Sequence, residues 1–407
     1  MSARLRRGGD GARERRAEAR LPDADRSPVG GGPPHVGQRR SRALPVGLLI
    51  AIVAVGAAVG LVLTRGHGVG SLLASARASP PAPLPHTRLA GVPPQTIADG
   101  TAPLRVTLSG PPAQDSPRPT LRPAVAGSWS TVGNSEVFTP AATLAPCGTY
   151  SLTVWKHTFA KGHGALEARH VLPLHVACPS IVALQEALAR QGYVGAVLHP
   201  RYAVQIPAGR ESLGEAARHA FRPFHGRLAP RPADAPPVEM GELDATTKGA
   251  LEVFQADHNL EPTGEPDAET WRLLLIVESL NHRNPRPYTW VSVTESLPET
   301  LQVHVGSRVA LSSPTNTGVP GAETAQGIFP IFERFTSTTM TGTNPDGSHY
   351  SDPGVPWVNY FNGGDAVHGF VRGSYGSPQS DGCVELPIGT AAAVYPMLQI
   401  GDIVWVT

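Results

Sequence analysis

The chain has 407 residues, with 34 lysines and arginines against 33 aspartates and glutamates, and a formal net charge of +1. At roughly 100–200 residues per domain, this length predicts a multidomain protein. The near balance of charge speaks against a chain built to bind nucleic acid, and we expect no nucleic-acid partner.

The first predicted elements are a basic tail over residues 1–42 and a single transmembrane helix over residues 43–64. Residues 43–64 carry no charge, and roughly 20 apolar residues can span a hydrocarbon core of about 30 Å. Arginines outnumber acidic residues in the tail. We therefore expect the tail in the cytoplasm and the rest of the chain outside the cell membrane.

A cleaved signal peptide is the alternative to this anchor, because Ala74-Ser75-Ala76 resembles a cleavage site. However, the apolar run is longer than the usual signal-peptide core, and the triplet lies well beyond its end. We therefore predict an uncleaved single-pass anchor with extracytoplasmic C-terminal domains. Residues 65–98 are rich in Pro, Ala and Ser and are predicted to form an extended linker.

Residues 99–179 are predicted to form a β-sandwich. The segments LRVTL, YSLTVW and LPLHVA are rich in β-branched and apolar residues between Pro, Gly, Asn and Ser, as is typical of short strands. The pattern GSWS…VFTP…LAPCGTYSLTV resembles bacterial immunoglobulin-like wall domains, which implies a spacing or docking role. Outside the cell we expect a disulfide between Cys147 and Cys178, worth about 3–4 kcal/mol for a loop of this size. Two buried free thiols are the alternative.

Residues 180–280 are predicted to form a small α-helical domain. The segment IVALQEALARQGY has apolar residues at helical spacing, and Asp244 and Asp267 are expected to cap two later helices joined by a turn at Thr263-Gly264. A resemblance to the three-helix peptidoglycan-binding domain is carried by Leu184, Gln185, Gly192, Tyr193, Thr247, Phe254, Gln255, Leu260, Gly264, Thr270 and Trp271. A long insertion at 196–240 interrupts the pattern, and a helical spacer that binds no glycan is the alternative.

The last region, residues 287–407, is predicted to be mainly β and to carry a cysteine nucleophile. His368 and Cys383 are 383 − 368 = 15 positions apart, joined by Gly, Ser and Pro. A thiolate is the reactive form of cysteine, and a nearby histidine can take the thiol proton and later protonate a leaving amine. With Cys147 and Cys178 paired, Cys383 is the odd thiol in an exported chain, which marks it as a reactive group. A buried unreactive thiol is the alternative.

The segment AVHGFVRGSYGSPQSDGCVELPIG resembles the L,D-transpeptidase (YkuD-type) catalytic domain, through its H-G…S-x-G-C-V-x-L core. The resemblance implies that Cys383 is the nucleophile and His368 its base. It also implies that the Gly369 region orients the imidazole through a backbone carbonyl, and that the Gly382-Cys383 backbone forms the oxyanion hole. The fold implied is a β-sandwich-like barrel. We expect no cofactor, and no spacing of His, Cys, Asp and Glu suggests zinc.

Two residues depart from that family pattern. Asp381 stands where the family usually has His, and Glu385 stands where Arg or Asn is common. A carboxylate at 381 would raise the thiol pKa; alternatively, it would hydrogen-bond His368 as the third member of a triad. The candidate wall of a substrate pocket consists of Tyr350, Trp357, Ser380 and Arg372, with core packing as the alternative for the aromatic residues.

The resemblance implies peptidoglycan L,D-transpeptidation: a cysteine thioester forms on the stem peptide, terminal D-Ala leaves, and an amine of a second stem gives a 3→3 cross-link. The implied partners are donor and acceptor stem peptides, the membrane through one helix, and carbapenem inhibitors. The alternatives are an L,D-carboxypeptidase, a cysteine peptidase acting on wall peptides, and an inactive wall-binding protein.

Overall fold

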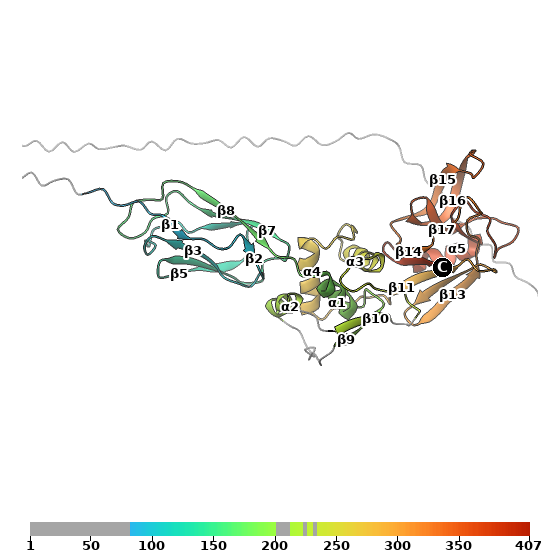
Figure 1. Ribbon diagram of the computed structural model, residues 1–407, viewed down its shortest axis with the longest axis horizontal. Coiled ribbons are helices and arrows are strands. Elements are labelled where there is room, and N and C mark those ends of the chain that lie inside the picture. Colours follow the sequence, from blue (N-terminus) through green and yellow to red (C-terminus); the bar gives the residue numbers. More distant parts are fainter. Residues whose placement is uncertain (1–81, 201–211, 223–225, 231–233) are drawn as a thin grey trace, which may run out of the picture. The chain divides into compact units, whose positions relative to one another are not determined.

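The computed structural model describes residues 82–200, 212–222, 226–230 and 234–407 (Figure 1). The predicted tail at 1–42, the predicted helix at 43–64 and the start of the linker lie outside the described residues. Within the described ranges, no helix is long and apolar enough to cross a membrane. Residues 79–407 form one compact unit.

The first described part consists of two four-stranded sheets. Their strand orders are β1-β3-β6-β5 and β2-β8-β7-β4. The strands are β1 (Leu89–Gly91), β2 (Thr96–Ile97), β3 (Leu104–Leu108), β4 (Thr120–Arg122), β5 (Gly127–Val132), β6 (Ser135–Pro140), β7 (Thr149–Val154) and β8 (His170–Val176). Both sheets contribute to one buried core that includes Val106, Phe138, Leu152 and Val176. This is a β-sandwich; its immunoglobulin-like character stays a prediction.

The sandwich begins earlier than the sequence suggested. The linker was expected to reach residue 98, yet β1 pairs with β3, and β2 pairs with β8. Ile97 is 4% exposed and belongs to the sandwich core. The expectation was wrong for residues 89–97 because strands of two or three residues among prolines give almost no alternation of apolar and polar positions.

A disulfide joins Cys147, just before β7, to Cys178, just after β8. These two strands are antiparallel neighbours, so the covalent bond ties their ends together. The predicted pairing is confirmed. Cys383 is the one free cysteine of the described residues, and it is buried.

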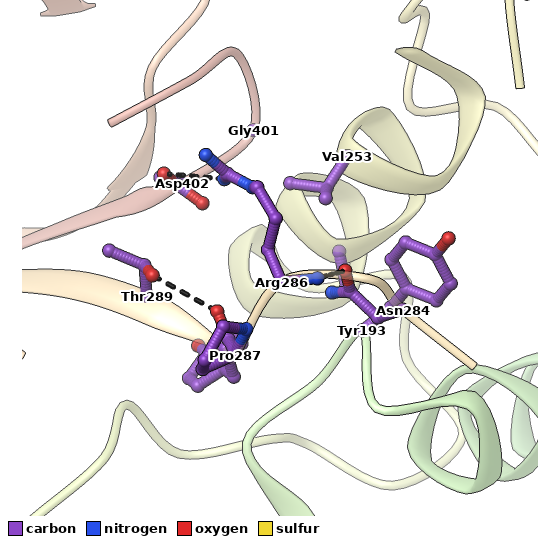
Figure 2. Close-up of a pocket in the computed structure, with 10 residues that line it drawn as sticks. Tyr193, Val253, Asn284, Arg286, Pro287, Thr289, Gly401 and Asp402 are labelled. Atoms are coloured by element: carbon purple, nitrogen blue, oxygen red, sulfur yellow. Dashed lines mark hydrogen bonds and ion pairs between the residues drawn. The ribbon is translucent and has the colours of Figure 1, made fainter. Parts of the chain in front are cut away.

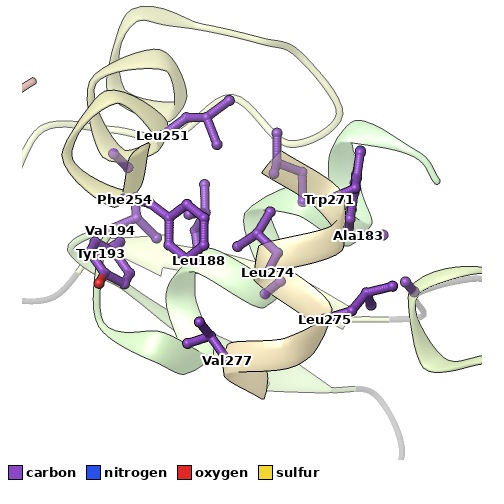
Figure 3. Packing of buried hydrophobic residues seen from close by; sticks show 14 of the residues in the cluster. Ala183, Leu188, Tyr193, Val194, Leu251, Phe254, Trp271, Leu274, Leu275 and Val277 are labelled. Atoms are coloured by element: carbon purple, nitrogen blue, oxygen red, sulfur yellow. The ribbon is translucent and has the colours of Figure 1, made fainter. Parts of the chain in front are cut away.

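The middle part is a helical module. Its elements are α1 (Ile181–Gln191), β9 (Ala196–Pro200), α2 (Leu213–Ala220), β10 (Gly226–Pro230), α3 (Ala245–Asp257) and α4 (Ala268–Ser279). Figure 3 shows its core, in which Leu188, Phe254, Trp271 and Leu274 converge from three helices. Each of these side chains is at most 2% exposed. Truncating a core residue of this size costs about 3–5 kcal/mol.

The predicted insertion at 196–240 is folded into this module. β9 and β10 pair antiparallel, and α2 begins with a capping box between Ser212 and Glu215. Ala216 and Ala217 of α2 are fully buried in the same core as α1 and α4. The insertion therefore adds a fourth helix to the three that were expected.

Two buried glutamines fasten the loops that precede α3 and α4. Gln185 in α1 donates to Glu239 O, Glu242 O and Thr247 Oγ1 and accepts from Gly241 N. Gln255 in α3 donates to Thr263 Oγ1, Glu265 O and Thr270 Oγ1 and accepts from Gly264 N.

The two predicted helix caps are present at the starts of α3 and α4. Asp244 accepts from Thr247 N at 2.7 Å, and Asp267 accepts from Thr270 N at 2.8 Å.

The C-terminal part packs two further sheets face to face. Their orders are β13-β12-β11-β19-β14 and β15-β16-β17-β18. The elements are β11 (Thr289–Thr294), β12 (Thr300–Val305), β13 (Arg308–Pro314), β14 (Gly327–Pro330), β15 (Glu333–Thr343), β16 (His349–Asn362), β17 (Asp365–Gly369), β18 (Val384–Leu386), α5 (Ile388–Val394), the 3₁₀ turn η1 (Tyr395–Met397) and β19 (Ile403–Val406). The shared core includes Val291, Val303, Val367, Val384 and Val404. The mainly-β expectation is confirmed.

Candidate active site

The nucleophile and the base lie on neighbouring strands. β17 and β18 are parallel, with Val367 opposite Val384 and His368 opposite Glu385. His368 lies within β17, and Cys383 lies immediately before β18. Pro387 follows as the N-cap residue of the short helix α5. The sheet thereby brings together two residues that are 15 positions apart in the chain.

His368 is 3% exposed, and its ring is held in place. Its Nδ1 lies 3.1 Å from the carbonyl oxygen of Gly369, and the ring of Phe370 packs edge-on at 5.9 Å. A carbonyl can only accept, so Nδ1 carries the proton and Nε2 keeps its lone pair. Burial lowers the His368 pKa below its ordinary value, which keeps the ring neutral and ready to accept a proton.

Cys383 is 8% exposed, and its thiol is protonated in the resting molecule. Burial raises the pKa of the thiol to about 12, and the charges of Asp365, Glu385 and Asp381 raise it further. Its Sγ donates to the carbonyl oxygen of Gly364 at 3.7 Å. The thiol therefore needs a proton acceptor when substrate arrives, since the thiolate is the attacking form.

The residue before the nucleophile has to be glycine. Gly382 has φ +105°, and a Cβ there would lie 2.5 Å from Oδ1 of Asp365. Among the hydrogen bonds of the described residues, the amides of Gly382 and Cys383 have no acceptor. Unpaired backbone N–H groups beside a nucleophile are the donors that an oxyanion requires.

Ser380 and Asp381 precede that glycine and differ in role. Ser380 is 3% exposed, and its hydroxyl donates to Cys383 O at 2.5 Å, which fixes the backbone of the turn. Asp381 is exposed, and within the described residues it makes no hydrogen bond to His368. Its carboxylate is one of the charges that raise the thiol pKa, and its role in catalysis stays a prediction.

A two-bonded ion pair forms one side of the site. Arg372 donates from Nε to Oε2 of Glu385 and from Nη2 to Oε1, both at 2.7 Å. The Glu385 side chain is 4% exposed and that of Arg372 is 30% exposed. The guanidinium also lies over the ring of Phe370, 4.8 Å from its centre. The pair neutralises a carboxylate that would otherwise be buried alone beside Cys383.

These groups line one pocket. Its lining consists of Met340, Tyr350, Asp352, Val355, His368, Phe370, Arg372, Ser380, Asp381, Cys383 and Glu385. The long hairpin of β15 and β16 supplies Met340, Tyr350, Asp352 and Val355. Sequence reasoning named Tyr350, Ser380 and Arg372 but missed Met340, Asp352 and Val355, because only the pairing of distant strands brings the hairpin to the nucleophile.

Trp357 does not line this pocket. Its ring lies 5.5 Å from that of Tyr395, and it packs against the core between the two sheets. The prediction of a pocket role was wrong for Trp357, and its alternative, core packing, is what the structure has. Gly369 also stays outside the lining; its carbonyl orients His368, and a Cβ at this position would lie 3.1 Å from that of Ala391 in α5.

A search of the described residues finds no group of three or more His, Cys, Asp and Glu that could hold a metal ion. The chemistry available in the pocket comes from the thiol, the imidazole, two backbone amides and the charged side chains around them. This set fits acyl transfer through a covalent thioester.

Comparison with known families agrees with this geometry. Residues 287–406 match the model of the L,D-transpeptidase catalytic domain, and residues 227–274 match the model of a peptidoglycan binding domain. Residues 287–406 are therefore similar to L,D-transpeptidase catalytic domains, and residues 227–274 are similar to peptidoglycan binding domains. The second match covers α3 and the first part of α4 but not α1. No curated protein sequence matches the chain.

Three solved structures illustrate the likeness. The catalytic domain of the E. faecium L,D-transpeptidase is 25% identical, covering 29% of this chain and 96% of that one, with a TM-score of 0.28. An L,D-transpeptidase from Mycobacterium smegmatis is 13% identical, covering 80% and 98%, with a TM-score of 0.27. L,D-transpeptidase 3 from Mycobacterium tuberculosis, bound to a faropenem-derived adduct, is 12% identical, covering 79% and 97%, with a TM-score of 0.27. The assignment of residues 287–406 depends on the family model and the site rather than on these superpositions.

Proposed function

We propose that the protein is a peptidoglycan L,D-transpeptidase that forms 3→3 cross-links through a thioester on Cys383. The observation that carries the proposal is the shared pocket of Cys383 and His368, inside the region that matches the L,D-transpeptidase model. The thiol attacks the carbonyl carbon of the third stem-peptide residue. The bond to the terminal D-Ala breaks, and D-Ala leaves as the free amino acid.

In the first step Nε2 of His368 takes the thiol proton as the C–S bond forms. The neutral state of the imidazole supports this role, because burial lowers its pKa, whereas the raised thiol pKa excludes a preformed thiolate at neutral pH. The imidazolium then gives its proton to the departing amine. The amides of Gly382 and Cys383 are the proposed donors to the oxyanion.

In the second step an amine of another stem attacks the thioester carbonyl, the C–N bond forms and the thiol of Cys383 is released. If water attacks instead, the same site acts as an L,D-carboxypeptidase. Carbapenems carry a strained acyl group of matching chemistry, and we expect them to acylate Cys383. A relative carrying a faropenem-derived adduct is in keeping with that expectation.

The cellular setting is part of the proposal. The uncharged segment 43–64 after a basic tail supports a single-pass anchor that leaves the domains outside the membrane. The peptidoglycan-binding domain supports retention at the cell wall. Together they would hold the catalytic pocket next to its polymeric substrate.

The test is incubation of the purified protein with tetrapeptide muropeptides and mass spectrometry of the products. Cross-linked dimers that have lost one D-Ala support transpeptidation, and both Cys383→Ser and His368→Gln should abolish them. Trimmed tripeptides alone would assign a carboxypeptidase, and an internal cut would assign a peptidase. If wild type gives neither product nor a carbapenem adduct on Cys383, the enzymatic proposal fails and an inactive wall-binding protein remains.

A further inference from the structure

Two carboxylates besides that of Glu385 line the Cys383 pocket. Asp352 comes from the β15–β16 hairpin, and Asp381 comes from the turn before the nucleophile. Tyr350 lies among them: burial raises the pKa of its phenol, and Cys383, Asp381 and Asp352 add to that effect. The two carboxylates thus come from different segments of the chain and line the same pocket as the sulfur.

These carboxylates are not neutralised within the pocket. The one guanidinium in the lining, that of Arg372, is already engaged by both oxygens of Glu385. Neither Asp352 nor Asp381 forms an ion pair in the part of the chain that the structure describes. The pocket mouth therefore carries an excess of negative charge, which favours a cationic group over an anionic one.

This charge hinders the first step of the proposed reaction. Asp381 raises the pKa of the thiol that has to be deprotonated. After acylation the sulfur is part of a neutral thioester. The nearby carboxylates then no longer disfavour it, and they do so again only when the sulfur leaves. The second substrate is an alkyl amine, which arrives as an ammonium ion because such amines have a pKa near 10 (about 10.4 for a lysine side chain). Asp381 then lies where a cation is delivered.

We propose that Asp381, with Asp352 of the β15–β16 hairpin, binds the ammonium group of the amine acceptor and thereby selects aminolysis over hydrolysis. This proposal rests on the proposed thioester on Cys383. The ammonium, held by the carboxylates, loses one proton to Nε2 of His368. The neutral amine attacks the thioester carbon, the C–N bond forms, the C–S bond breaks, and the sulfur leaves with the second N–H proton. The imidazolium releases its proton to solvent, so thioester and ammonium give amide, thiol and one proton.

The test is a partition experiment on the full protein at pH 7. Cys383 is acylated with a tetrapeptide donor in the presence of either ethylamine, which is an ammonium ion, or hydroxylamine, which is largely uncharged. The ratio of amide or hydroxamate to hydrolysed tripeptide is measured by mass spectrometry. Variants are Asp381→Asn, Asp352→Asn and, as the matched control, Glu261→Gln, an equal change of charge on an exposed residue of the helical module.

Asp381→Asn should lower the ethylamine partition ratio about fivefold, in line with the loss of one partly exposed charge pair, while leaving the hydroxylamine ratio unchanged. Asp352→Asn should act in the same direction, and Glu261→Gln should match wild type. Equal loss with both amines, or no loss with ethylamine, overturns the assignment of Asp381 but leaves the thioester mechanism intact. Absence of any acyl-enzyme in wild type overturns both proposals.

Discussion

At the scale of single residues, the pocket combines a neutral base with a strongly protonated nucleophile. Burial acts on both groups: it lowers the pKa of His368 and raises that of Cys383 to about 12. Each shift disfavours the charged form of its own group. The resting site therefore holds a neutral thiol and a neutral imidazole rather than an ion pair. The reactivity of the thiol depends further on how much the nearby carboxylates raise its pKa.

Replacing Asp381 by Asn should make Cys383 more reactive. The carboxylate raises the thiol pKa, so its removal increases the thiolate fraction, by an expected three- to tenfold at pH 8, since each pKa unit corresponds to about a factor of ten. The rate constant of alkylation by iodoacetamide, followed by intact mass, measures this directly. Asp346→Asn on the β15–β16 turn removes an exposed charge outside the pocket lining and serves as the control. A slower reaction in Asp381→Asn would instead favour the triad role for this residue.

The pH dependence of acyl-enzyme formation should have its acidic limb below pH 6.5. The ordinary histidine pKa is about 6.5, and burial lowers that of His368. The ring therefore stays neutral at pH 7 and becomes a cation, unable to accept the thiol proton, only at lower pH. Measuring kcat/KM for a tetrapeptide donor against pH gives the midpoint for the free enzyme. A midpoint above 6.5 would contradict the neutral-base assignment.

At the scale of elements, the helical module contains two copies of the same loop motif. The motif G-x-x-D-x-x-T runs from Gly241 to Thr247 and again from Gly264 to Thr270. In each copy the glycine has positive φ, the Asp caps the helix, and a glutamine from an earlier helix bonds the glycine N–H and the Thr hydroxyl. The same local chemistry thus starts both α3 and α4.

Gln255→Leu should therefore destabilise the helical module more than the small change in side-chain volume suggests. The change leaves Gly264 N–H without its acceptor and three acceptors without their donor, in a side chain that is 1% exposed. Unsatisfied buried groups cost about 1–3 kcal/mol each, and we expect a total loss of about 3 kcal/mol. Chemical unfolding followed by far-ultraviolet circular dichroism at the helical band measures it. Gln114→Leu, on the exposed surface of the sandwich, should change little.

The sequence predicted these elements unevenly, for physical reasons. Asp244, Asp267 and the Thr263-Gly264 turn were found because caps and turns depend on neighbouring residues. α2 was missed because its buried face consists of alanines, which give little apolar contrast. β15 was not assigned to the pocket because its TSTTMTGT segment is polar, and its place beside Cys383 depends on strand pairing rather than on a local pattern.

At the scale of the whole molecule, the helical module and the catalytic sheets meet within the compact unit 79–407. A Cβ added to Gly249 of α3 would lie 2.4 Å from the carbonyl of Gly401, so the backbones approach closely there. Figure 2 shows a neighbouring pocket lined from both sides, by Tyr193 and Val253 as well as by Gly401 and Asp402. The sequence did not predict this contact. α3 and β19 are about 150 positions apart, and sequence patterns indicate only local structure.

The connection between α4 and β11 crosses this junction and carries Arg286. Its guanidinium lies 3.4 Å from Oδ2 of Asp402 (Figure 2), and the same carboxylate accepts from Gln399 N at 2.9 Å. Burial raises the pKa of Asp402 to about 7, while the charges of Arg286 and Arg334 oppose that rise. The carboxyl group of Asp402 at this junction thus changes between its charged and its neutral form within the physiological pH range.

Arg286→Met should for that reason destabilise the protein in a pH-dependent way. A raised carboxyl pKa means that the folded state takes up a proton as pH falls through about 7, after which Asp402 needs no cationic partner. At pH 8 the variant has to bury an unpaired carboxylate or take up a proton, and we expect a loss of about 2 kcal/mol in unfolding free energy. At pH 5 the loss should fall below about 1 kcal/mol, because the neutral acid costs less to bury.

Thermal unfolding midpoints of wild type and Arg286→Met at pH 5 and pH 8 test this, with Arg308→Met on the exposed surface of β13 as the control. The difference between variant and wild type should be larger at pH 8, and the control should show no such dependence. An equal difference at both pH values would mean that Arg286 stabilises the junction by packing alone. A pH-dependent difference would instead show that the contact between the helical module and the C-terminal sheets depends on the charge of Asp402.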